Sequence, residues 1–435
     1  MSRGGRPPFV VLDDDPTGVQ TLAGIRVLLS WDAGRIAAAL DGRSALHLIT
    51  NTRALPAEHV EDAVEQAARQ ARIAAPEARL VLRGDSTLRG YPLEEYLGVR
   101  SVVAPGGWPV LLLVPALPSA GRITAGGVHF FVRDGLRVPL HETEYARDAT
   151  FAYASARVLE WAEERSRGVF PARSGAEVPL AELRTRGSQA VSELLAALAH
   201  TRAPAALVPD VESEDDLALI AQGYEEAVAD GVDVIVRCAP AFAGVLAGTT
   251  AKAAAPLPDD RAGLLVVCGS YVEQTTRQLA RLLDEIGHAP VEVDVVALAG
   301  SNPGVEIERA AAAASRQLVA SGIAVVSTPR SRPEGTTTLE AGEQIAFNLA
   351  RVAQLVLPRP GVVVVKGGIT SAVLLRDGVG ASEADVLGPV MPGVSRWSAS
   401  WPDGTPLDYL VVPGNVGDDD LLRRLVSDMR GSTVC

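Results

Sequence analysis

Short apolar runs without polar alternation recur along the chain, separated by longer Ala- and Leu-rich stretches. Such runs are typical of strands buried on both faces, as in a parallel sheet covered by helices. The pattern therefore predicts an α/β fold whose mostly parallel sheets are flanked by helices. In the first half, the expected strands are Phe9–Leu12, Ile25–Leu29, Leu46–Thr50, Leu80–Arg83, Val110–Val114, Ala206–Val208 and Val232–Arg237.

The length of 435 residues exceeds what one ordinary core organises, so we expect two domains. The stretch Ala247–Gly263 is small, polar and proline-containing, which favours an interdomain linker. An N-terminal domain of residues 1–246 and a C-terminal domain of residues 263–435 follow from this boundary. The strands expected in the second domain are Leu264–Cys268, Val291–Val296, Ala324–Ser327, Val362–Val365 and Tyr409–Val412.

A β-hairpin is expected as an insertion in the N-terminal domain. The segment Gly126–Pro139 has the sequence "GGVHFFVRDGLRVP" and interrupts the alternation of strands and helices. Asp134-Gly135 near its centre is a typical hairpin turn, because both residues tolerate positive φ angles.

Composition excludes some classes of function. The net charge of -13 argues against general nucleic-acid binding, which needs an excess of Lys and Arg. No apolar stretch reaches the ~20 residues needed to span a bilayer. The N-terminus lacks the features of a secretory signal, and the cysteines Cys238, Cys268 and Cys435 are far apart, odd in number and not in metal-ligand spacing. We expect a cytoplasmic protein, with a homodimer as the default assembly.

The first candidate site is "VVLDDDPTG" (Val10–Gly18), in which an apolar run ends in three acids. Ligands of open α/β sheets bind at the carboxyl ends of strands, so Asp13, Asp14 and Asp15 are expected to face a cleft. Three adjacent acids repel one another, so they need a cation, a shared proton or a ligand hydroxyl. The alternative is a solvated turn in which an aspartate caps the next helix.

Two further candidates follow other strands of the first half. The segment "LRGDSTLRG" (Leu82–Gly90) combines guanidinium forks, which suit a carboxylate or phosphate, with an acid and hydroxyls, which suit a sugar-like ligand. The loop Pro115–His129 adds one arginine that could clamp an anion, or it is a long connection. The alternative for the first segment is a helix cap beside surface arginines. The candidate residues are Arg83, Asp85, Ser86, Arg89 and Arg122.

The second half carries small residues at three strand ends, in "VVCGSYVEQ", "VVVVKGGITS" and "VVPGNVGDDDLL". Small residues and free backbone N–H groups at a strand end suit a phosphate or a nucleotide. None of the three is a Walker A motif. Glycines in tight turns between strands and helices are the structural alternative. The candidate nucleotide contacts are Ser270, Gly367, Gly368, Ile369, Thr370, Gly414 and Asn415.

A rival interpretation is a phosphatase of the haloacid-dehalogenase type. The spacing Asp13-x-Asp15-x-Thr17 is similar to the nucleophile motif of that class, and "GDDD" at Gly417–Asp420 could supply its late acids. The second cluster, however, falls in the other predicted domain. This interpretation also leaves the segment Arg83–Gly90 and the three glycine loops without a role.

Taken in order, the motifs resemble the four-carbon acid sugar kinase family. The segments "DDDPTG", "RGDSTLRG", "PALPSAGRIT" with "GGVHF", "GSYVEQTTRQL", "KGGITS" and "PGNVGDDDLL" all match, over nearly the whole chain. The sequence departs from many relatives at Arg83-Gly84, where they have Lys and a branched or small residue, and at Pro413, where they have Lys-Ser. The resemblance implies an N-terminal domain that binds a sugar acid and a C-terminal domain that binds ATP.

The resemblance also implies roles for the candidate residues. Asp15 would act as base or orienting group at the acceptor hydroxyl, with Asp14 beside it, and the arginines of the second motif would hold the substrate. The nucleotide would contact the glycine loops. The expected reaction is transfer of the γ-phosphoryl group of Mg²⁺-ATP to a tetronate, a 3-oxo-tetronate or a similar acid. The other alternative is a sugar-acid-binding protein without catalytic activity.

Overall fold

The structure is a computed structural model that describes residues 7–15, 22–133, 135–148, 150–250, 253–258, 263–336, 338–414 and 416–431. The chain forms two compact units. Unit 1 contains the residues up to Gly18 and Trp31–Thr250, and unit 2 contains Val19–Ser30 and the residues from Ala251. The segment Val19–Ser30 therefore belongs to unit 2, although it lies in the N-terminal half of the sequence.

Unit 1 is built on a parallel sheet with the strand order β3-β1-β4-β11-β5-β10-β9. Its strands are β1 (Phe9–Asp13), β3 (Ala45–Ile49), β4 (Arg79–Arg83), β5 (Val110–Val114), β9 (Ala176–Val178), β10 (Ala206–Pro209) and β11 (Val234–Cys238). Its helices are α1 (Ala33–Leu40), α2 (Ala57–Ala74), α3 (Pro92–Val103), α4 (Val158–Arg165), α5 (Leu180–Arg186), α6 (Gln189–His200), α7 (Glu214–Ala229) and α8 (Pro240–Ala247).

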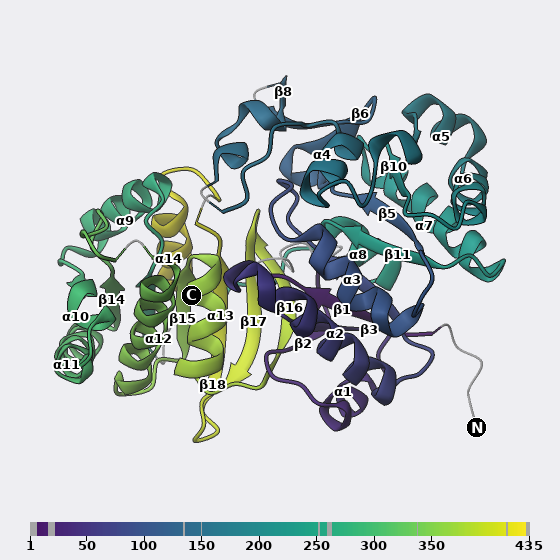
Figure 1. Ribbon diagram of the computed structural model, residues 1–435. Coiled ribbons are helices and arrows are strands. Elements are labelled where there is room, and N and C mark those ends of the chain that lie inside the picture. Colours follow the sequence, from purple (N-terminus) through teal and green to yellow (C-terminus); the bar gives the residue numbers. More distant parts are fainter. Residues whose placement is uncertain are drawn as a thin grey trace. The chain divides into compact units, whose positions relative to one another are not determined.

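Both faces of this sheet are buried, as the apolar runs predict. Phe9 and Val11 of β1 belong to a core that includes side chains of α6, α7 and α8. Val10 and Leu12, which alternate with them and point to the opposite face, are equally buried. Helices α2 and α3 pack against each other, and α2 contacts β1 (Figure 1). The prediction of a helix-covered parallel sheet is confirmed.

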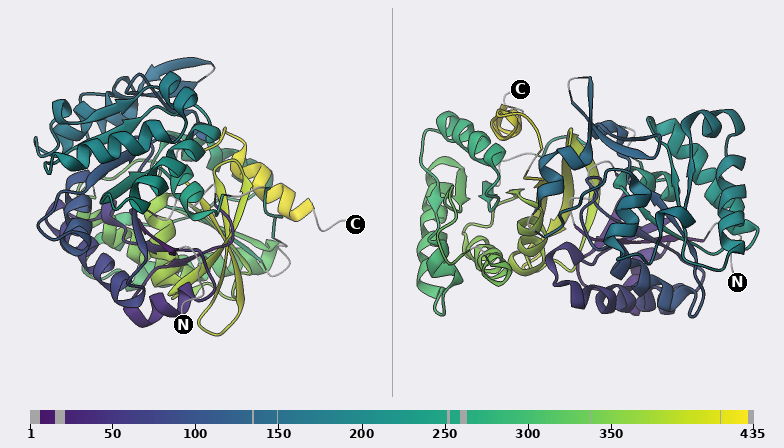
Figure 2. Two further views of the ribbon diagram at one scale, coloured as in Figure 1. Left: turned by 90° about the vertical axis from the view of Figure 1, so that its right-hand side faces the viewer. Right: turned by 45° about the horizontal axis from the view of Figure 1, so that its top comes forward.

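A small antiparallel sheet stands apart from the main sheet of unit 1 (Figures 1 and 2). It contains β6 (Arg122–Ala125), β7 (Val128–Arg133) and β8 (Leu136–Pro139). The hairpin expected from the sequence is formed by β7 and β8, with Gly135 at a φ of 77°. Asp134 of its turn lies outside the described residues.

Unit 2 has a sheet with the strand order β13-β14-β12-β15-β18-β17-β16-β2, parallel from β13 to β18 and antiparallel beyond. Its strands are β2 (Ile25–Leu28), β12 (Leu264–Cys268), β13 (Val291–Glu292), β14 (Ile323–Ser327), β15 (Val362–Lys366), β16 (Glu383–Met391), β17 (Val394–Ser400) and β18 (Pro406–Val412). Its helices are α9 (Glu273–Ile286), α10 (Val295–Ala299), α11 (Gly304–Ser321), α12 (Leu339–Leu355), α13 (Gly368–Val373) and α14 (Leu421–Gly431).

Two local predictions are corrected. β2 was expected with the parallel strands of the first half, but it pairs antiparallel with β16 of unit 2. There the guanidinium of Arg26 donates to both carboxylate oxygens of Asp385, at 2.9 and 2.7 Å. The strand expected over Val291–Val296 is only two residues long. The Asp294 carboxylate accepts hydrogen bonds from the backbone N–H groups of Val296 and Ala297 and so caps the start of α10.

A glycine in α3 permits the close packing of two helices in unit 1. A Cβ atom on Gly98 would lie 2.7 Å from the carbonyl oxygen of Glu61 in α2. We expect Gly98→Ala to lower the free energy of unfolding by about 1–3 kcal/mol, because the helices must move apart. Gly342→Ala in α12 is the matched control, since a Cβ there meets nothing within 4 Å, and it should be neutral or stabilising. Equal thermal shifts for both variants would contradict the packing argument.

Candidate functional site

The acids of the first motif lie where the strand order of unit 1 reverses. β1 is flanked by β3 on one side and by β4 on the other, and all three strands are parallel. Their carboxyl ends therefore meet at one edge, at a position where open α/β sheets bind ligands. Asp13 ends β1 and Arg83 ends β4, so the structure brings the first two sequence motifs together.

Arg83 holds the row of acids in place. Its guanidinium donates to the Asp13 carboxylate and to the backbone carbonyl of Asp15, and it lies 2.9 Å from the Asp14 carboxylate. The side chain is only 2% exposed. A buried guanidinium of this kind offsets the repulsion between adjacent acids, which the sequence analysis identified as the problem of this motif.

Arg53 is a functional candidate that the sequence analysis missed. It lies in a short 3₁₀ turn, Thr52–Ala54, that follows β3. Its guanidinium pairs with Asp14 at 3.1 Å, with Asp15 at 2.5 Å and with Asp85 at 3.6 Å. It thus joins the two motifs. The rule that ligands gather at strand ends could have found it, because β3 precedes it directly.

Asp14 is the acid with the most unusual electrostatics. Burial raises its pKa to about 7, although Arg53 and Arg83 oppose the shift. Its two carboxylate oxygens are buried and make ion pairs, but neither accepts an oriented hydrogen bond from the described residues. A carboxyl group in this state is near its pKa at neutral pH and can take up or release a proton.

Asp13 has a different environment. His47 of β3 donates from Nδ1 to the Asp13 carboxylate at 3.0 Å, and both side chains are fully buried. Burial alone would raise the pKa of Asp13, but the charges and hydrogen bonds of Arg83 and His47 outweigh it and hold the pKa below the ordinary value. Asp13 is therefore an ionised structural partner of these two side chains.

The two glycines of "RGDSTLRG" make room for a buried arginine. A Cβ atom on Gly84 would lie 2.6 Å from the guanidinium of Arg237, and one on Gly90, whose φ is 115°, would lie 2.8 Å from it. Arg237 comes from β11 and donates to the Glu95 carboxylate at 2.8 Å. Neither glycine can be replaced without displacing this ion pair, which explains their place in the motif.

The loop between these glycines is fixed through its carbonyl groups. His129 Nε2 donates to Ser86 O at 2.9 Å, and the Tyr153 hydroxyl donates to Thr87 O at 3.0 Å. Arg237 donates to Arg89 O at 3.4 Å, and Arg165 donates to Gly90 O at 3.2 Å. Burial lowers the pKa of His129 to about 4, so it stays a neutral donor. These contacts hold the loop in one conformation.

The side chains of this loop form a second ion-pair group. Arg89 donates to Asp85 at 2.7 Å and lies 3.4 Å from Asp148. Burial alone would raise the pKa of Asp85, but Arg89 and Arg53 outweigh it and hold the pKa well below the usual range. Ser86 is buried in the same loop.

Arg122 is set apart from the acids. Its guanidinium donates to Ala120 O at 2.7 Å and lies 4.8 Å from the centroid of the Phe131 ring. Phe131 in turn contacts Tyr145, whose ring lies under Arg89. In the described part of the chain, Arg122 makes no ion pair with the aspartates of the first two motifs.

The glycine loops of unit 2 also meet at a reversal of strand order. β12 lies between β14 and β15, and the carboxyl ends of these parallel strands share one edge. A Cβ atom on Gly269 would lie 2.3 Å from Thr370 Oγ1, and one on Gly414 would lie 2.7 Å from Ser270 Oγ. Gly367, with a φ of 124°, lies beside Ser270.

These contacts bring together most of the predicted nucleotide residues. Gly368 begins α13, and Ile369 is exposed in its first turn. Asn415 lies outside the described residues.

Lys366, a residue without a role in the sequence analysis, supports one of these loops from below. It is fully buried at the end of β15, and its Nζ donates to Pro413 O at 2.6 Å and to Val416 O at 3.2 Å. Burial lowers the pKa of Lys366 to about 8. Gln278 of α9 also donates to Val416 O, at 2.9 Å. Thr275 donates to Gly414 O at 3.3 Å, so side chains from α9 and β15 together hold the loop around Gly414.

Family models match both halves of the chain. A family model described as a sugar-binding N-terminal domain matches residues 9–246, and one described as a nucleotide-binding C-terminal domain matches residues 265–422. The chain belongs to the four-carbon acid sugar kinase family, also called DUF1537. The family resemblance read from the motifs is thereby confirmed.

Solved structures of low sequence identity share the fold of this kinase-family chain. A Salmonella typhimurium LT2 protein, provisionally described as a tRNA synthase, has a TM-score of 0.69 at 18% identity and covers 96% of this chain and 98% of its own. A Haemophilus influenzae protein of the DUF1537 family has a TM-score of 0.62 at 18% identity, with 97% and 100% covered. At these identities the likeness shows the fold alone. No curated protein matches.

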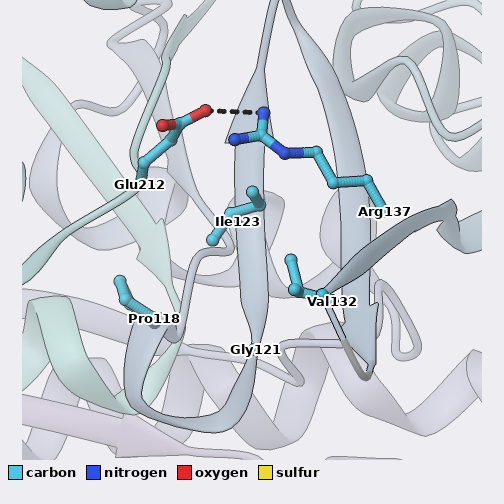
Figure 3. A pocket seen from close by; sticks show the side chains of 7 residues that line it. Pro118, Gly121, Ile123, Val132, Arg137 and Glu212 are labelled. Carbon is cyan, nitrogen blue, oxygen red and sulfur yellow. Dashed lines mark ion pairs between the residues drawn. The ribbon is translucent and has the colours of Figure 1, made fainter.

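Other features of this family member do not add a site. A hollow of about 350 Å³ beside the small sheet is lined by Pro118, Gly121, Ile123, Val132, Gly135, Arg137 and Glu212, of which none was a candidate (Figure 3). Its charged pair, Arg137 and Glu212, is joined at 2.7 Å. Among the described residues, no group of three His, Cys, Asp or Glu side chains could hold a metal ion, and no helix is long and apolar enough to cross a membrane.

The raised pKa of Asp14 predicts a pH effect on stability. The unfolded chain ionises this carboxyl near pH 3.8, whereas the folded state keeps it protonated up to about 7. Between these values the folded state binds more protons, so stability relative to Asp14→Asn should fall as the pH rises. Urea unfolding at about pH 5, 6 and 7 measures the trend. A difference between the two proteins that does not change with pH would contradict the raised pKa.

Proposed function

We propose that the protein is an ATP-dependent kinase that phosphorylates a hydroxyl group of a small sugar acid, such as a tetronate or a 3-oxo-tetronate. One observation carries this proposal. A proton-accepting carboxyl, Asp14, lies within an arginine cluster in the unit that matches a sugar-binding domain, and the same chain carries a nucleotide-binding domain. A sugar-acid substrate needs both groups, since it presents a hydroxyl and a carboxylate.

The exposure of the side chains suggests how the substrate is divided among them. Asp15 is 14% exposed and would accept or orient the proton of the reacting hydroxyl, with Asp14 beside it. Arg53 and Arg89 are 14% and 25% exposed, so we assign the substrate carboxylate to them. Asp85 and Ser86 would bind its other hydroxyls.

The two remaining arginines have lesser parts in the proposal. Arg83, expected from the sequence to bind substrate, is engaged with the acids, and we propose that it positions them. Arg122 receives no direct contact with substrate.

The nucleotide side of the proposal rests on Ser270 and on the loops at Gly367–Thr370 and Gly414, which gather at the ends of adjacent strands. Transfer of a phosphoryl group depends mainly on positioning and on neutralising charge, so few protein groups need to react covalently. Mg²⁺ accompanies the triphosphate in such reactions. The described residues offer no cluster of ligands for it, so we assign it no protein ligand.

The two alternatives are less well supported. A phosphatase of the haloacid-dehalogenase type would need Asp13 as a nucleophile, but this carboxylate is fully buried and held by Arg83 and His47. Its proposed late acids are occupied as well, since Asp418, Asp419 and Asp420 each pair with an arginine. A binding protein without activity would bind the acid without turnover.

We expect ADP to form only when Mg²⁺-ATP and one particular acid are both present. A panel of four- and five-carbon acids, assayed for ADP, tests this directly.

Asp15→Asn should lower kcat at least ~100-fold, the range for losing a general base or orienting group. The exposed Asp62→Asn of α2 is the matched control and should keep full activity. Turnover of a sugar phosphate without any nucleotide would favour the phosphatase instead.

Ser270→Trp is expected to weaken nucleotide binding and to leave acid binding unchanged. The larger side chain would enter the tightly packed space beside Gly367 and Gly414, where a Cβ atom on either glycine would lie 3.3 Å from Ser270 Cβ or 2.7 Å from Ser270 Oγ, respectively. Titration calorimetry with ATP and, separately, with the acid measures both affinities. Normal binding of both ligands would refute the assignment of the nucleotide to this edge of unit 2.

A further inference from the structure

The turn after β14 reaches the candidate nucleotide site, although no sequence motif pointed to it. It comprises the residues Thr328–Arg332 ("TPRSR"), and β14 is the strand beside β12. The guanidinium of Arg330 donates to Ser270 O at 3.0 Å, to Thr328 O at 2.7 Å and to Thr328 Oγ1 at 2.8 Å. Three acceptors therefore fix this cation against Ser270, the residue proposed to contact the nucleotide.

A second arginine of the same turn approaches the next residue. Arg332 is exposed, and its guanidinium carbon lies 4.7 Å from the centroid of the Tyr271 ring. Such stacking holds the guanidinium by one face and leaves its N–H groups free to meet a ligand.

The charges of these arginines are not neutralised within the described part of unit 2. Arg330 and Arg332 each lack an ion pair with any described carboxylate, and so does the buried Lys366 at the end of the neighbouring β15. By contrast, Arg277 and Arg309 on the covering helices both pair with acids.

Carbonyl and hydroxyl oxygens accept the hydrogen bonds of Arg330 and Lys366 but do not neutralise the charge of either side chain. Uncompensated cations gathered at one edge of a sheet, in a chain of net charge -13, create a local field that attracts an anion. Of the groups on a nucleotide, only the phosphates carry negative charge.

We propose that Arg330 and Arg332 bind the phosphate groups of the nucleotide, with Lys366 adding positive charge at the end of β15. This inference rests on the proposed function and adds to it the residues that recognise the phosphates. Arg330 is held in place before the ligand arrives, so little of its side-chain freedom is lost on binding. Arg332 supplies an exposed contact.

The test compares the binding of ATP, ADP, AMP and adenosine to the whole protein by calorimetry. A charge-assisted hydrogen bond contributes about 1.5–3 kcal/mol, so Arg330→Gln and Arg332→Gln should each weaken ATP binding about 10- to 100-fold. The loss should shrink along the series from ATP to AMP, and adenosine should bind to the variants as it does to the wild type. Both variants should also show a weaker dependence of ATP affinity on salt.

Two controls separate this effect from a change of fold or of net charge. Arg332→Lys keeps the positive charge and should recover most of the affinity for ATP. Arg316→Gln removes the same charge from an exposed position on α11 and should leave ATP binding unchanged. Because Arg332 is exposed, its substitution should not disturb folding, and thermal unfolding of each variant verifies this.

The outcomes are distinct. If the wild type binds ATP and both glutamine variants bind it within about twofold, the inference is wrong and the proposed function stands. An equal loss for adenosine and ATP would mean that the turn acts on the nucleoside part, directly or by holding Ser270 in place, and not on the phosphates, which also overturns the inference. If the wild type binds no nucleotide, the proposed function itself fails.

Discussion

The buried guanidinium of Arg83 is the interaction on which the candidate substrate site depends. Three consecutive acids begin at Asp13, the last residue of β1, and without a cation among them their mutual repulsion would oppose folding of this edge. Arg83 contacts two of the carboxylates and the backbone carbonyl of the third residue. Removal of one partner from such a buried group leaves charges unpaired, which costs far more than a surface ion pair contributes.

The two units place their candidate sites at the same kind of position in the fold, but the charged side chains at these positions differ. In each, a central strand ends at a reversal of strand order, where loops from neighbouring strands meet. In unit 1 the edge carries acids and arginines in mutual pairs, among which Arg53 joins Asp14, Asp15 and Asp85. In unit 2 it carries small residues together with Arg330, Arg332 and Lys366, which make no ion pair with a described carboxylate. The first edge suits a ligand with hydroxyls and a carboxylate, and the second suits phosphates.

Rigidity at the first edge comes from groups outside the proposed substrate contacts. The loop between Gly84 and Gly90 has its carbonyls anchored by donors from other elements, including His129 and Tyr153. Glycine is required at both ends of this loop, because the guanidinium of Arg237 fills the space that a side chain would occupy. A loop anchored in this way can present Asp85 and Arg89 in a fixed geometry, which is what positioning catalysis requires.

The sequence by itself determined the α/β class, the parallel strands and the order of the motifs, because burial on both faces and strand-end chemistry are written in short segments. It could not place β2, whose partner β16 lies about 360 residues further along the chain. Nor could it identify Arg237, Arg330 or Lys366 as parts of the sites. These side chains have no local signature, since their roles arise only when distant strand ends meet, and only the tertiary structure decides which ends those are.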